Sequence, residues 1–410
     1  MTNEIKNVPE LRFPEFKEEW VEKKLGEITS KISDGIHSTP TYDSNGDIYF
    51  INGNNLVNGR IDFKTSKKIS VQEFNKYKNY LEAKNTLLLS INGTIGNIAK
   101  YEGENILLGK SAAYINVVSK FISRYYIFYY LQTSKIYESF LRELTGTTIK
   151  NLSLKSIKNI IVYISELDEQ QKISTFFSKL DRQIELEEQK LEKLKEQKKG
   201  YMQKIFSQEL RFKDEYGNDY PEWKKKKLYD VANYRRGSFP QPYGNKEWYD
   251  EKNGEPFVQV VDVDKNMKLH DQTKQKISDL AKPKSVKGFK GDIVVTLQGS
   301  IGRVALLHYD AYIDRTLLLI DSFKIEMNKN YFKYVLYLLF LKEKERAPGG
   351  TIKTITKKVL SNFKIDIPNV GEQEKIGKFF EKYDKCIQKQ SNKIELLKKR
   401  KKSFLQKMFV

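Results

Sequence analysis

Cysteine and histidine are scarce in this chain of 410 residues, which carries one cysteine, Cys386, and three histidines. One thiol excludes a disulfide framework and any zinc site built from several cysteines, and it is typical of a reducing compartment. The longest apolar runs, Tyr125–Leu131 and Tyr334–Leu341, fall far short of the ~20 residues of a membrane-spanning helix. The first residues also lack the pattern of a secretory signal. We therefore expect a cytoplasmic protein with no membrane partner.

Motifs for catalysis and cofactor binding are missing as well. No G-x-G-x-x-G stretch follows a strand-like run, and no Asn-Pro-Pro-Tyr or Asp-Pro-Pro-Tyr tetrapeptide occurs. The segment Gly103–Ser111 resembles a phosphate loop, but five residues separate its glycines where the motif requires four. None of the histidines has a nearby pattern of nucleophile and base. These absences predict a binding protein with no catalytic residue, cofactor site or metal site of its own.

Basic residues are in clear excess, with 73 Lys plus Arg against 53 Asp plus Glu and a formal net charge of +20. Such a charge favours a polyanionic partner, above all nucleic acid, although a lysine-rich composition also occurs on an ordinary solvated surface. The hydrophobic content of 39% is enough to form real cores, and the length indicates two or three domains.

The chain is a tandem duplication. From Thr148 and from Thr351 onward, two segments stay in register at an offset of 203 residues without a gap. The matched pairs at this offset include Glu169-Gln170 with Glu372-Gln373, Phe176-Phe177 with Phe379-Phe380, Asp181 with Asp384, and Trp20 with Trp223. A further anchor pairs Ser90–Ala99 with Thr296–Ala305 at an offset of 206.

The stretches between these anchors differ, because Lys31–Leu88 and Tyr234–Val294 share almost no identity. Matching frames with divergent inserts are what two reading domains with different targets would show. Short β-like runs separated by Asn-Gly, Gly-Asp and Pro-containing turns predict that each insert is a mixed, β-rich domain. The aromatic segments Arg124–Leu131 and Tyr331–Leu338 have the spacing of a buried core helix, with an exposed stacking platform as the alternative.

After each insert, apolar residues recur in steps of three and four, the heptad spacing of a coiled coil. The predicted seam consists of Phe177, Leu180, Ile184, Leu191, Leu194 and Tyr201 in the first copy and Phe380, Tyr383, Ile387, Ile394, Leu397 and Phe404 in the second. Both seams carry a lysine at matching positions, Lys198 and Lys401. Parallel pairing in register would bring these lysines together, so we expect an antiparallel intramolecular pair that acts as a ruler.

The order of motifs closely resembles the DNA specificity subunit of type I restriction-modification enzymes. Each copy carries Ile-Gly-(Asn/Arg)-x-Ala, then Gly-Thr-Thr-Ile-Lys or Gly-Gly-Thr-Ile-Lys, then Glu-Gln-(Gln/Glu)-Lys-Ile opening the heptad helix. The resemblance covers essentially the whole chain. It implies an α+β fold, a pseudo-twofold tandem repeat of two β-rich target recognition domains joined by two long helices. The expected parts are recognition domains at 1–150 and 210–353, with heptad-helix spacers at 151–209 and 354–410.

The family resemblance also implies a function. Each recognition domain would read one half of a bipartite site in double-stranded DNA, and two methylation subunits would dock on the matching parts. Restriction subunits would complete the assembly, with S-adenosylmethionine, ATP and Mg²⁺ bound by those partners and no cofactor in this chain. The alternatives are a coiled-coil DNA-binding or scaffold protein that acts without methylation partners, and a nuclease with a diffuse acidic site.

Candidate DNA contacts follow from loop position and side-chain chemistry. The segment Ser33–Pro40 resembles an early loop of the family, and Arg235–Gln241 occupies the analogous place in the second copy. Arginine can pair with guanine, and glutamine or asparagine with adenine. Residues beside the shared glycines are further candidates, although the glycines Gly93, Gly96, Gly299 and Gly302 themselves are better explained as turn formers. The candidates are Ser33, His37, Ser38, Thr39, Asn92, Thr94, Arg235, Arg236, Gln241, Gln298, Ser300 and Arg303, with Lys110 and Arg315 as phosphate contacts.

Overall fold

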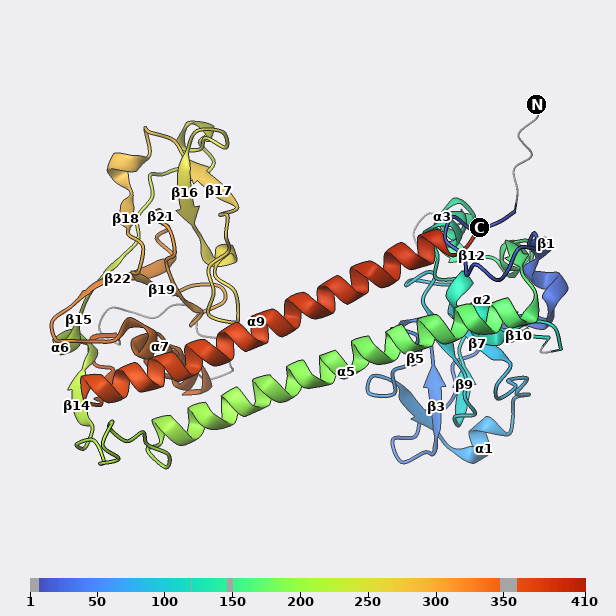
Figure 1. The fold of residues 1–410 in the computed structure, drawn as a ribbon, viewed down its shortest axis with the longest axis horizontal. Helices are drawn as coiled ribbons and strands as arrows, with labels where there is room; N and C mark the ends of the chain where they lie inside the picture. Colours follow the sequence, from blue (N-terminus) through green and yellow to red (C-terminus); the bar gives the residue numbers. More distant parts are fainter. Residues whose placement is uncertain (1–6, 119, 146–149, 347–359) are drawn as a thin grey trace. The chain divides into compact units, whose positions relative to one another are not determined.

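The computed structural model describes residues 7–118, 120–145, 150–346 and 360–410, and it consists of two compact units. Unit 1 comprises Met1–Leu191 and Gln390–Val410, and unit 2 comprises Glu192–Lys389. Each unit contains one β-rich domain and parts of both long helices, α5 (Leu167–Phe206) and α9 (Val370–Lys407) (Figure 1). The predicted Gly-Thr-Thr-Ile-Lys and Gly-Gly-Thr-Ile-Lys motifs fall largely outside the described residues, as does the expected boundary at 353.

The domain of unit 1 is built on two sheets. The larger is antiparallel, with the strand order β2-β10-β7-β8, and the smaller has the order β6-β3-β9, in which β3 and β9 run parallel. The strands of these sheets are β2 (Thr29–Asp34), β3 (Ile48–Ile51), β6 (Lys67–Ile69), β7 (Thr86–Ser90), β8 (Ile98–Lys100), β9 (Ile106–Leu108) and β10 (Ala112–Val117). The remaining elements are β1 (Val21–Lys24), η1 (Leu25–Ile28), η2 (Gly53–Asn55), β4 (Leu56–Val57), β5 (Arg60–Ile61), α1 (Val71–Phe74), α2 (Arg124–Tyr130), α3 (Ser134–Arg142), β11 (Leu144–Thr145), β12 (Asn151–Leu152), α4 (Leu154–Lys158) and β13 (Ile161–Ile164).

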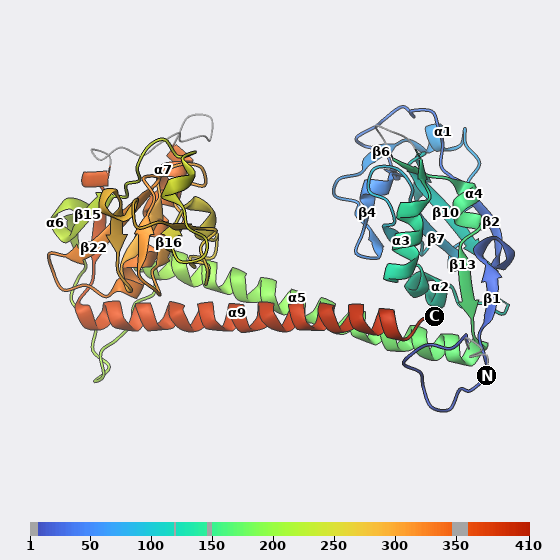
Figure 2. The same cartoon turned by 90° about the horizontal axis from the view of Figure 1, so that it is seen from above.

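The domain of unit 2 repeats the larger sheet of unit 1 and has one more strand in its second sheet. Figure 2 shows its strands β15, β16 and β22 together with α7. Its larger sheet has the order β15-β22-β19-β20, and its second sheet has the order β17-β16-β21-β18, again with one parallel pair, β16 and β21. The strands of these sheets are β15 (Ala232–Arg236), β16 (Glu255–Val258), β17 (Gln275–Ile277), β18 (Val286–Gly288), β19 (Ile293–Thr296), β20 (Val304–Leu306), β21 (Ala311–Ile313) and β22 (Leu317–Phe323). The remaining elements are β14 (Lys224–Lys227), α6 (Leu228–Val231), η3 (Lys246–Trp248), η4 (Val260–Asp262), η5 (Lys282–Lys284), α7 (Lys329–Arg346) and β23 (Lys364–Ile367).

The central strands are apolar on both faces because each separates two cores. In β7, Leu87 and Leu89 belong to the core under α2, whereas Leu88 belongs to the core of the smaller sheet. Side chains alternate between the faces of a strand, so a continuous apolar run marks a strand buried on both sides. The aromatic segments lie in α2 and in α7, and Tyr126 and Tyr331 are fully buried. The predicted core helices are therefore confirmed.

The Glu-Gln motif at the start of each long helix ties the helix to its domain. In unit 1, Glu169 accepts hydrogen bonds from Trp20 Nε1 at 2.9 Å and from Arg12 at 2.7 and 2.8 Å. Gln170 Oε1 accepts from the Ser123 backbone N–H at 2.9 Å, at the residue that caps α2. Charge-assisted bonds to a buried carboxylate are among the stronger polar contacts, so this motif fixes the helix against the domain.

Unit 2 repeats every one of these contacts. Glu372 accepts from Trp223 Nε1 at 2.9 Å and from Arg211 at 3.1 and 2.7 Å. Gln373 Oε1 accepts from the Asn328 backbone N–H at 2.9 Å, just before α7. The duplication seen in the sequence is thus a duplication of the contacts that join helix to domain.

The two long helices run antiparallel within each unit, as the matching lysines predict. In unit 1, Lys401 of α9 lies 2.7 Å from Asp181 of α5. In unit 2, Lys198 of α5 lies 2.5 Å from Asp384 of α9. Each lysine meets the aspartate of the other repeat, and opposite charges replace the like charges that parallel pairing would bring together. The expected α+β fold with an antiparallel helix pair is confirmed.

The predicted seam residues occupy different environments along these helices. Phe177, Ile184, Phe380, Ile394 and Leu397 are buried. The seam residues of intermediate exposure are Leu180, Leu191, Leu194, Tyr383, Ile387 and Phe404. Tyr201 is exposed, although its ring lies 5.2 Å from that of Phe379.

Each domain core is completed by the end of the helix that begins in the other repeat. In unit 1, the Phe409 ring lies 5.3 Å from Tyr126 and 5.8 Å from Phe177. In unit 2, the equivalent Phe206 ring lies 5.7 Å from Tyr331 and 6.2 Å from Phe380. Because Phe206 follows from the first copy and Phe409 from the second, the two repeats exchange helix ends. No helix among the described residues is long and apolar enough to span a membrane.

Candidate nucleic-acid interface

Three segments that are distant in sequence meet at one edge of the unit 1 domain. The segment after β2 joins the turn between β9 and β10, because the Ile36 backbone N–H donates to Leu108 O at 2.8 Å. The loop between β7 and β8 reaches the same turn through Asn92 Nδ2, which donates to Lys110 O at 3.4 Å. Seven predicted contact residues therefore come from segments that the fold brings together.

The side chains of this edge differ in how freely they can bind a ligand. His37 has 73% of its side chain exposed and lies 2.8 Å from Asp34, whereas Ser33 lies within β2 and is half-buried. Ser38, Thr39 and Lys110 are exposed. The remaining predicted residue, Thr94, is exposed, and its backbone carbonyl accepts a hydrogen bond from Ser90.

The same three segments meet in unit 2. The Gly237 backbone N–H, just after β15, donates to Leu317 O at 3.0 Å, and Leu297 N–H donates to Thr316 O at 2.8 Å. The turn between β21 and β22 carries Arg315, whose guanidinium lies 4.9 Å from the centre of the Tyr243 ring. Arg315 thus occupies the turn that carries Lys110 in unit 1.

Some of the predicted residues in unit 2 already have partners in the protein. Arg235 Nε lies 3.3 Å from Asp321, and Arg303 Nη1 donates to Val263 O at 2.9 Å. Arg236 and Gln241 are exposed, as is Ser300, whereas Gln298 is half-buried. Arg236, Gln241, Ser300 and Arg315 are therefore exposed side chains of this edge that can form the hydrogen bonds expected for base or phosphate contacts.

The shared glycines form turns, as expected. Gly93 and Gly96 have φ values of +74° and +84°, and Gly299 and Gly302 have +67° and +81°. Glycine adopts this left-handed region without the steric cost that other residues have there. These glycines shape the loops beside the candidate contacts in both units.

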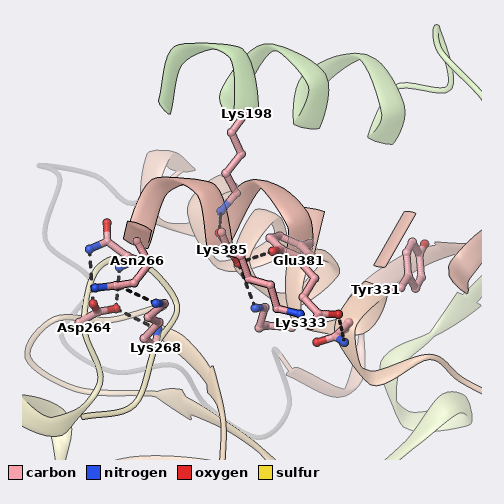
Figure 3. A network of polar contacts seen from close by, with 12 residues as sticks. Lys198, Asp264, Asn266, Lys268, Tyr331, Lys333, Glu381 and Lys385 are labelled. Carbon is pink, nitrogen blue, oxygen red and sulfur yellow. Dashed lines mark hydrogen bonds and ion pairs between the residues drawn. The ribbon is translucent and has the colours of Figure 1, made fainter. Parts of the chain in front are cut away.

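Sequence reasoning missed a buried polar cluster around the helix aspartates. Asp384 accepts hydrogen bonds from Tyr334 Oη at 2.5 Å, Lys198 Nζ at 2.5 Å and Lys333 Nζ at 3.4 Å. Figure 3 shows the two lysines of this cluster, Lys198 on α5 and Lys333 on α7. Burial lowers the pKa of Lys333, while Asp384 opposes that effect. The pKa of Tyr334 is raised well above its ordinary value by burial and by Asp384. The sequence signals of this cluster are the residues matched at an offset of 203, Asp181 with Asp384 and Lys198 with Lys401.

The corresponding cluster in unit 1 uses a different second lysine. Asp181 accepts from Tyr129 Oη at 2.9 Å and pairs with Lys401. Lys100 on β8 is half-buried, and its pKa is lowered by burial and raised in part by Asp181. The cluster is therefore retained while one of its cations comes from another element.

A cavity of about 300 Å³ lies in unit 2 between α5, α7, α9 and the turn at 265–267. Its wall combines apolar side chains, including Met202 and Leu338, with Lys195, Lys199 and Lys265. A second cavity of about 440 Å³ shares Lys265 and extends to the loop Gly299–Arg303. Within the described residues, no group of three or more His, Cys, Asp or Glu side chains is placed to hold a metal ion.

Comparison with known proteins gives consistent matches over nearly the whole chain. It is 26% identical to a putative type I restriction enzyme MjaX specificity subunit from Methanocaldococcus jannaschii, across 97% of this chain and 95% of the relative. It is 27% identical to the type I restriction enzyme MjaVIII specificity subunit of the same organism, across 83% and 79%.

Two solved structures share the fold. The S subunit of a type I restriction-modification system from M. genitalium superposes with a TM-score of 0.61 at 16% identity, covering 98% of this chain and 99% of that one. A chain from a study of complex assembly and conformational transition of the type I R-M system also gives 0.61, at 18% identity and 95% and 97% coverage. The family model described as the type I restriction modification DNA specificity domain matches twice, at residues 17–196 and 220–399, and the chain belongs to this family.

Proposed function

We propose that this chain is the sequence-specific DNA-binding subunit of a type I restriction-modification enzyme and reads a bipartite site, one half with each domain. One observation carries the proposal. The two domains share the strand order of the larger sheet and the frame contacts, yet the segments that meet at the matching edge carry different side chains, Ser33–Thr39 in one and Arg235–Gln241 in the other. A common scaffold with two different edges is suited to reading two different sequences.

The chemistry of each edge fits duplex DNA. Arg236 can donate two hydrogen bonds to guanine, and Gln241 can pair with adenine in the major groove. Lys110 and Arg315, in equivalent turns, can contact phosphates and fix the position of each domain without reading sequence. The net charge of +20 supplies the long-range attraction for a polyanion.

We further propose that the chain has no catalytic activity and directs partners to the site. Two methylation subunits would dock on the duplicated frame and methylate adenine at N6, and restriction subunits would join them for cleavage. S-adenosylmethionine, ATP and Mg²⁺ would bind to those partners. The names of the similar proteins, specificity subunits of restriction enzymes, support this assignment.

The test is to purify the chain with candidate methylation subunits and to map the methylated adenines by sequencing. We expect a bipartite site and a complex with two methylation subunits per chain. Arg236→Ala or Gln241→Ala should change base preference only in the second half-site, and Ser38→Ala only in the first. Methyl transfer or Mg²⁺-dependent cleavage by the chain alone would contradict the proposal. Failure to bind any methylation subunit would favour a DNA-binding or scaffold protein that acts alone.

A further inference from the structure

In both units, one turn of the variable domain contacts a long helix. We call these segments docking turn 1, residues 57–60, and docking turn 2, residues 264–268. Both lie inside the stretches that share almost no sequence identity. Each nevertheless contacts a long helix at a matching position of the repeat, which points to a common mechanical role.

Docking turn 1 is held to α5 by an ion pair with two hydrogen bonds. Arg60 Nη1 and Nη2 donate to the two carboxylate oxygens of Glu185 at 3.0 and 2.9 Å. Gly59 has a φ of +81°, and a Cβ at this position would lie 2.8 Å from Phe128 Cζ on α2. Docking turn 1 therefore packs closely against α2 and is bound to α5 by the ion pair.

Docking turn 2 is held to α9. Lys268 Nζ donates to Gln388 Oε1 at 2.6 Å, and the Asp264 carboxylate accepts from the backbone N–H groups of Asn266 and Lys268 at 2.8 and 2.9 Å (Figure 3). Met267 has a φ of +60° and is only 6% exposed, in the core that also contains Met202 of α5. A bulky residue rarely adopts this backbone conformation. We infer that the strained backbone of Met267 is retained because it places the side chain in the core.

The two docking turns are equivalent by position. Their helix partners, Glu185 and Gln388, are separated by the repeat offset of 203 residues. Each turn follows a single 3₁₀ turn, η2 or η4, and in each a backbone hydrogen bond joins the residues that flank the turn. These bonds are Asp62 N–H to Asn55 O at 2.7 Å and His270 N–H to Asp262 O at 2.9 Å.

We propose that the docking turns fix the orientation of each recognition domain on its helix, with Arg60–Glu185 and Lys268–Gln388 as the positioning pairs. The inference rests on the proposed function, because orientation matters only if each domain must present its edge to DNA in a set direction. These residues read no base. They determine where the reading edge points.

Each docking turn and its positioning pair form a joint between domain and helix, joint 1 with Arg60–Glu185 and joint 2 with Lys268–Gln388. The two joints differ in how they hold the domain. A planar guanidinium that meets both carboxylate oxygens fixes direction as well as distance, whereas one ammonium bonded to an amide fixes distance alone. Arg60 and Arg182 hold the pKa of Glu185 at about 2, so the carboxylate is ionised at neutral pH. Joint 1 therefore depends on charge, and joint 2 depends on the buried Met267.

The orientation of domain 1 can be measured without DNA. The full chain, with Cys386→Ser to remove the native thiol, is spin-labelled through Lys64→Cys in the domain and Lys179→Cys on α5, both at exposed positions. Pulsed electron resonance then gives the distance distribution between the labels. We expect Arg60→Ala to broaden it to about twice its original width, since a rigid contact becomes a free one. The charge reversal Arg60→Glu with Glu185→Arg, made together with Arg182→Ala so that no like charge lies beside the new arginine, should restore the narrow distribution.

Arg182→Ala is the matched control. Arg182 Nη1 also donates to Glu185, at 2.9 Å, but both residues lie on α5 and no domain is held by that contact. We expect its distribution to match the unaltered chain. Unchanged widths in Arg60→Ala, or failure of the charge reversal to narrow the distribution, would overturn the proposal.

A second readout links the joint to recognition. In the complex with methylation subunits, Arg60→Ala should weaken binding to the mapped site about tenfold and relax the preferred spacing between half-sites, because pre-organisation is lost. Base preference within each half-site should stay the same. A change of base preference would make Arg60 a reading residue and overturn its positioning role. If the unaltered chain binds no specific site, the proposed function fails. The distance measurement still tests whether Arg60 and Glu185 fix the orientation of the domain.

Discussion

The larger sheets of the two units have the same strand order, but the stretches Lys31–Leu88 and Tyr234–Val294 share almost no sequence identity. What they share is the pattern of burial. Leu88 of β7 and Val294 of β19 face the smaller core of their domains, whereas their neighbours on both sides face the core under the helix. The comparison teaches that the topology is specified by which residues face which core, and that loop sequence is free to vary around it.

A second comparison shows that the copies conserve a charge while changing its source. Unit 1 has Phe128 in α2 and Lys100 in β8, and the equivalent positions in unit 2 hold Lys333 in α7 and Leu306 in β20. Both lysines bring a positive charge towards the helix aspartate of their unit. The charge is therefore a property of the site, and no single position is required to supply it.

The largest effect should come from removing one copy. A fragment of residues 1–212 keeps Phe206 but lacks Phe409, which packs against Trp20 and Tyr126. A second fragment can supply Phe206 in its place, with Lys198 of one chain facing Asp181 of the other. We expect a twofold dimer whose melting temperature rises with concentration. Sedimentation measures whether the fragment is a dimer, and Phe206→Ala is the control that should abolish the dimer. A folded monomer would count against the exchange of helix ends.

The next largest effect compares the two aspartates. Asp384→Ala removes the carboxylate that pairs with the buried Lys333 and the half-buried Lys198 and should lower the free energy of unfolding by about 3 kcal/mol. Asp181→Ala should cost about 1 kcal/mol, because the Asp181 side chain is 34% exposed where that of Asp384 is 14% exposed. Chemical denaturation of both variants tests the order. Equal losses would show that burial does not distinguish the two clusters.

A smaller effect concerns the acid titration of Glu185. Its depressed pKa of about 2 means that the folded state binds this proton less readily than the unfolded state. The stabilisation is complete above the unfolded pKa of about 4.3 and disappears as the pH falls towards 2. Carboxyl NMR should show Arg60→Ala raising the pKa of Glu185 towards its ordinary value. An unaltered titration would mean that Arg60 does not hold this carboxylate in solution.

The smallest effect concerns the equivalent turns of the two edges. Lys110→Ala and Arg315→Ala should each reduce the slope of log affinity against log salt concentration by about one, since one phosphate contact is lost. Neither substitution should change base preference. Titrations at several salt concentrations test both variants, and Lys290→Ala, at an exposed lysine outside the edge segments, serves as the control. A changed half-site would place the substituted residue among those that read bases.

The sequence predicts much of this architecture because duplication and periodicity are visible in one chain. The offset of 203 identifies the frame, and the sequence match of Lys198 with Lys401 predicts antiparallel helices. Other features leave no local signal. The docking turns involve Arg60 and Lys268, which cannot be aligned by identity, and the Glu185 and Gln388 contacts depend on tertiary geometry. Arg303 was predicted as a DNA contact from its place beside a glycine, but its bond to Val263 O depends on a loop 40 residues away.

The central claim is that two interchangeable domains on one duplicated frame read two different half-sites. Residues 29–117, from β2 to β10, are replaced by residues 232–323, from β15 to β22, and the chain is assembled with methylation subunits. Sequencing of methylated adenines then maps the site. The account predicts an interrupted palindrome built only from the second half-site of the original chain. Retention of the first half-site would contradict it, because recognition would then lie outside the exchanged domain.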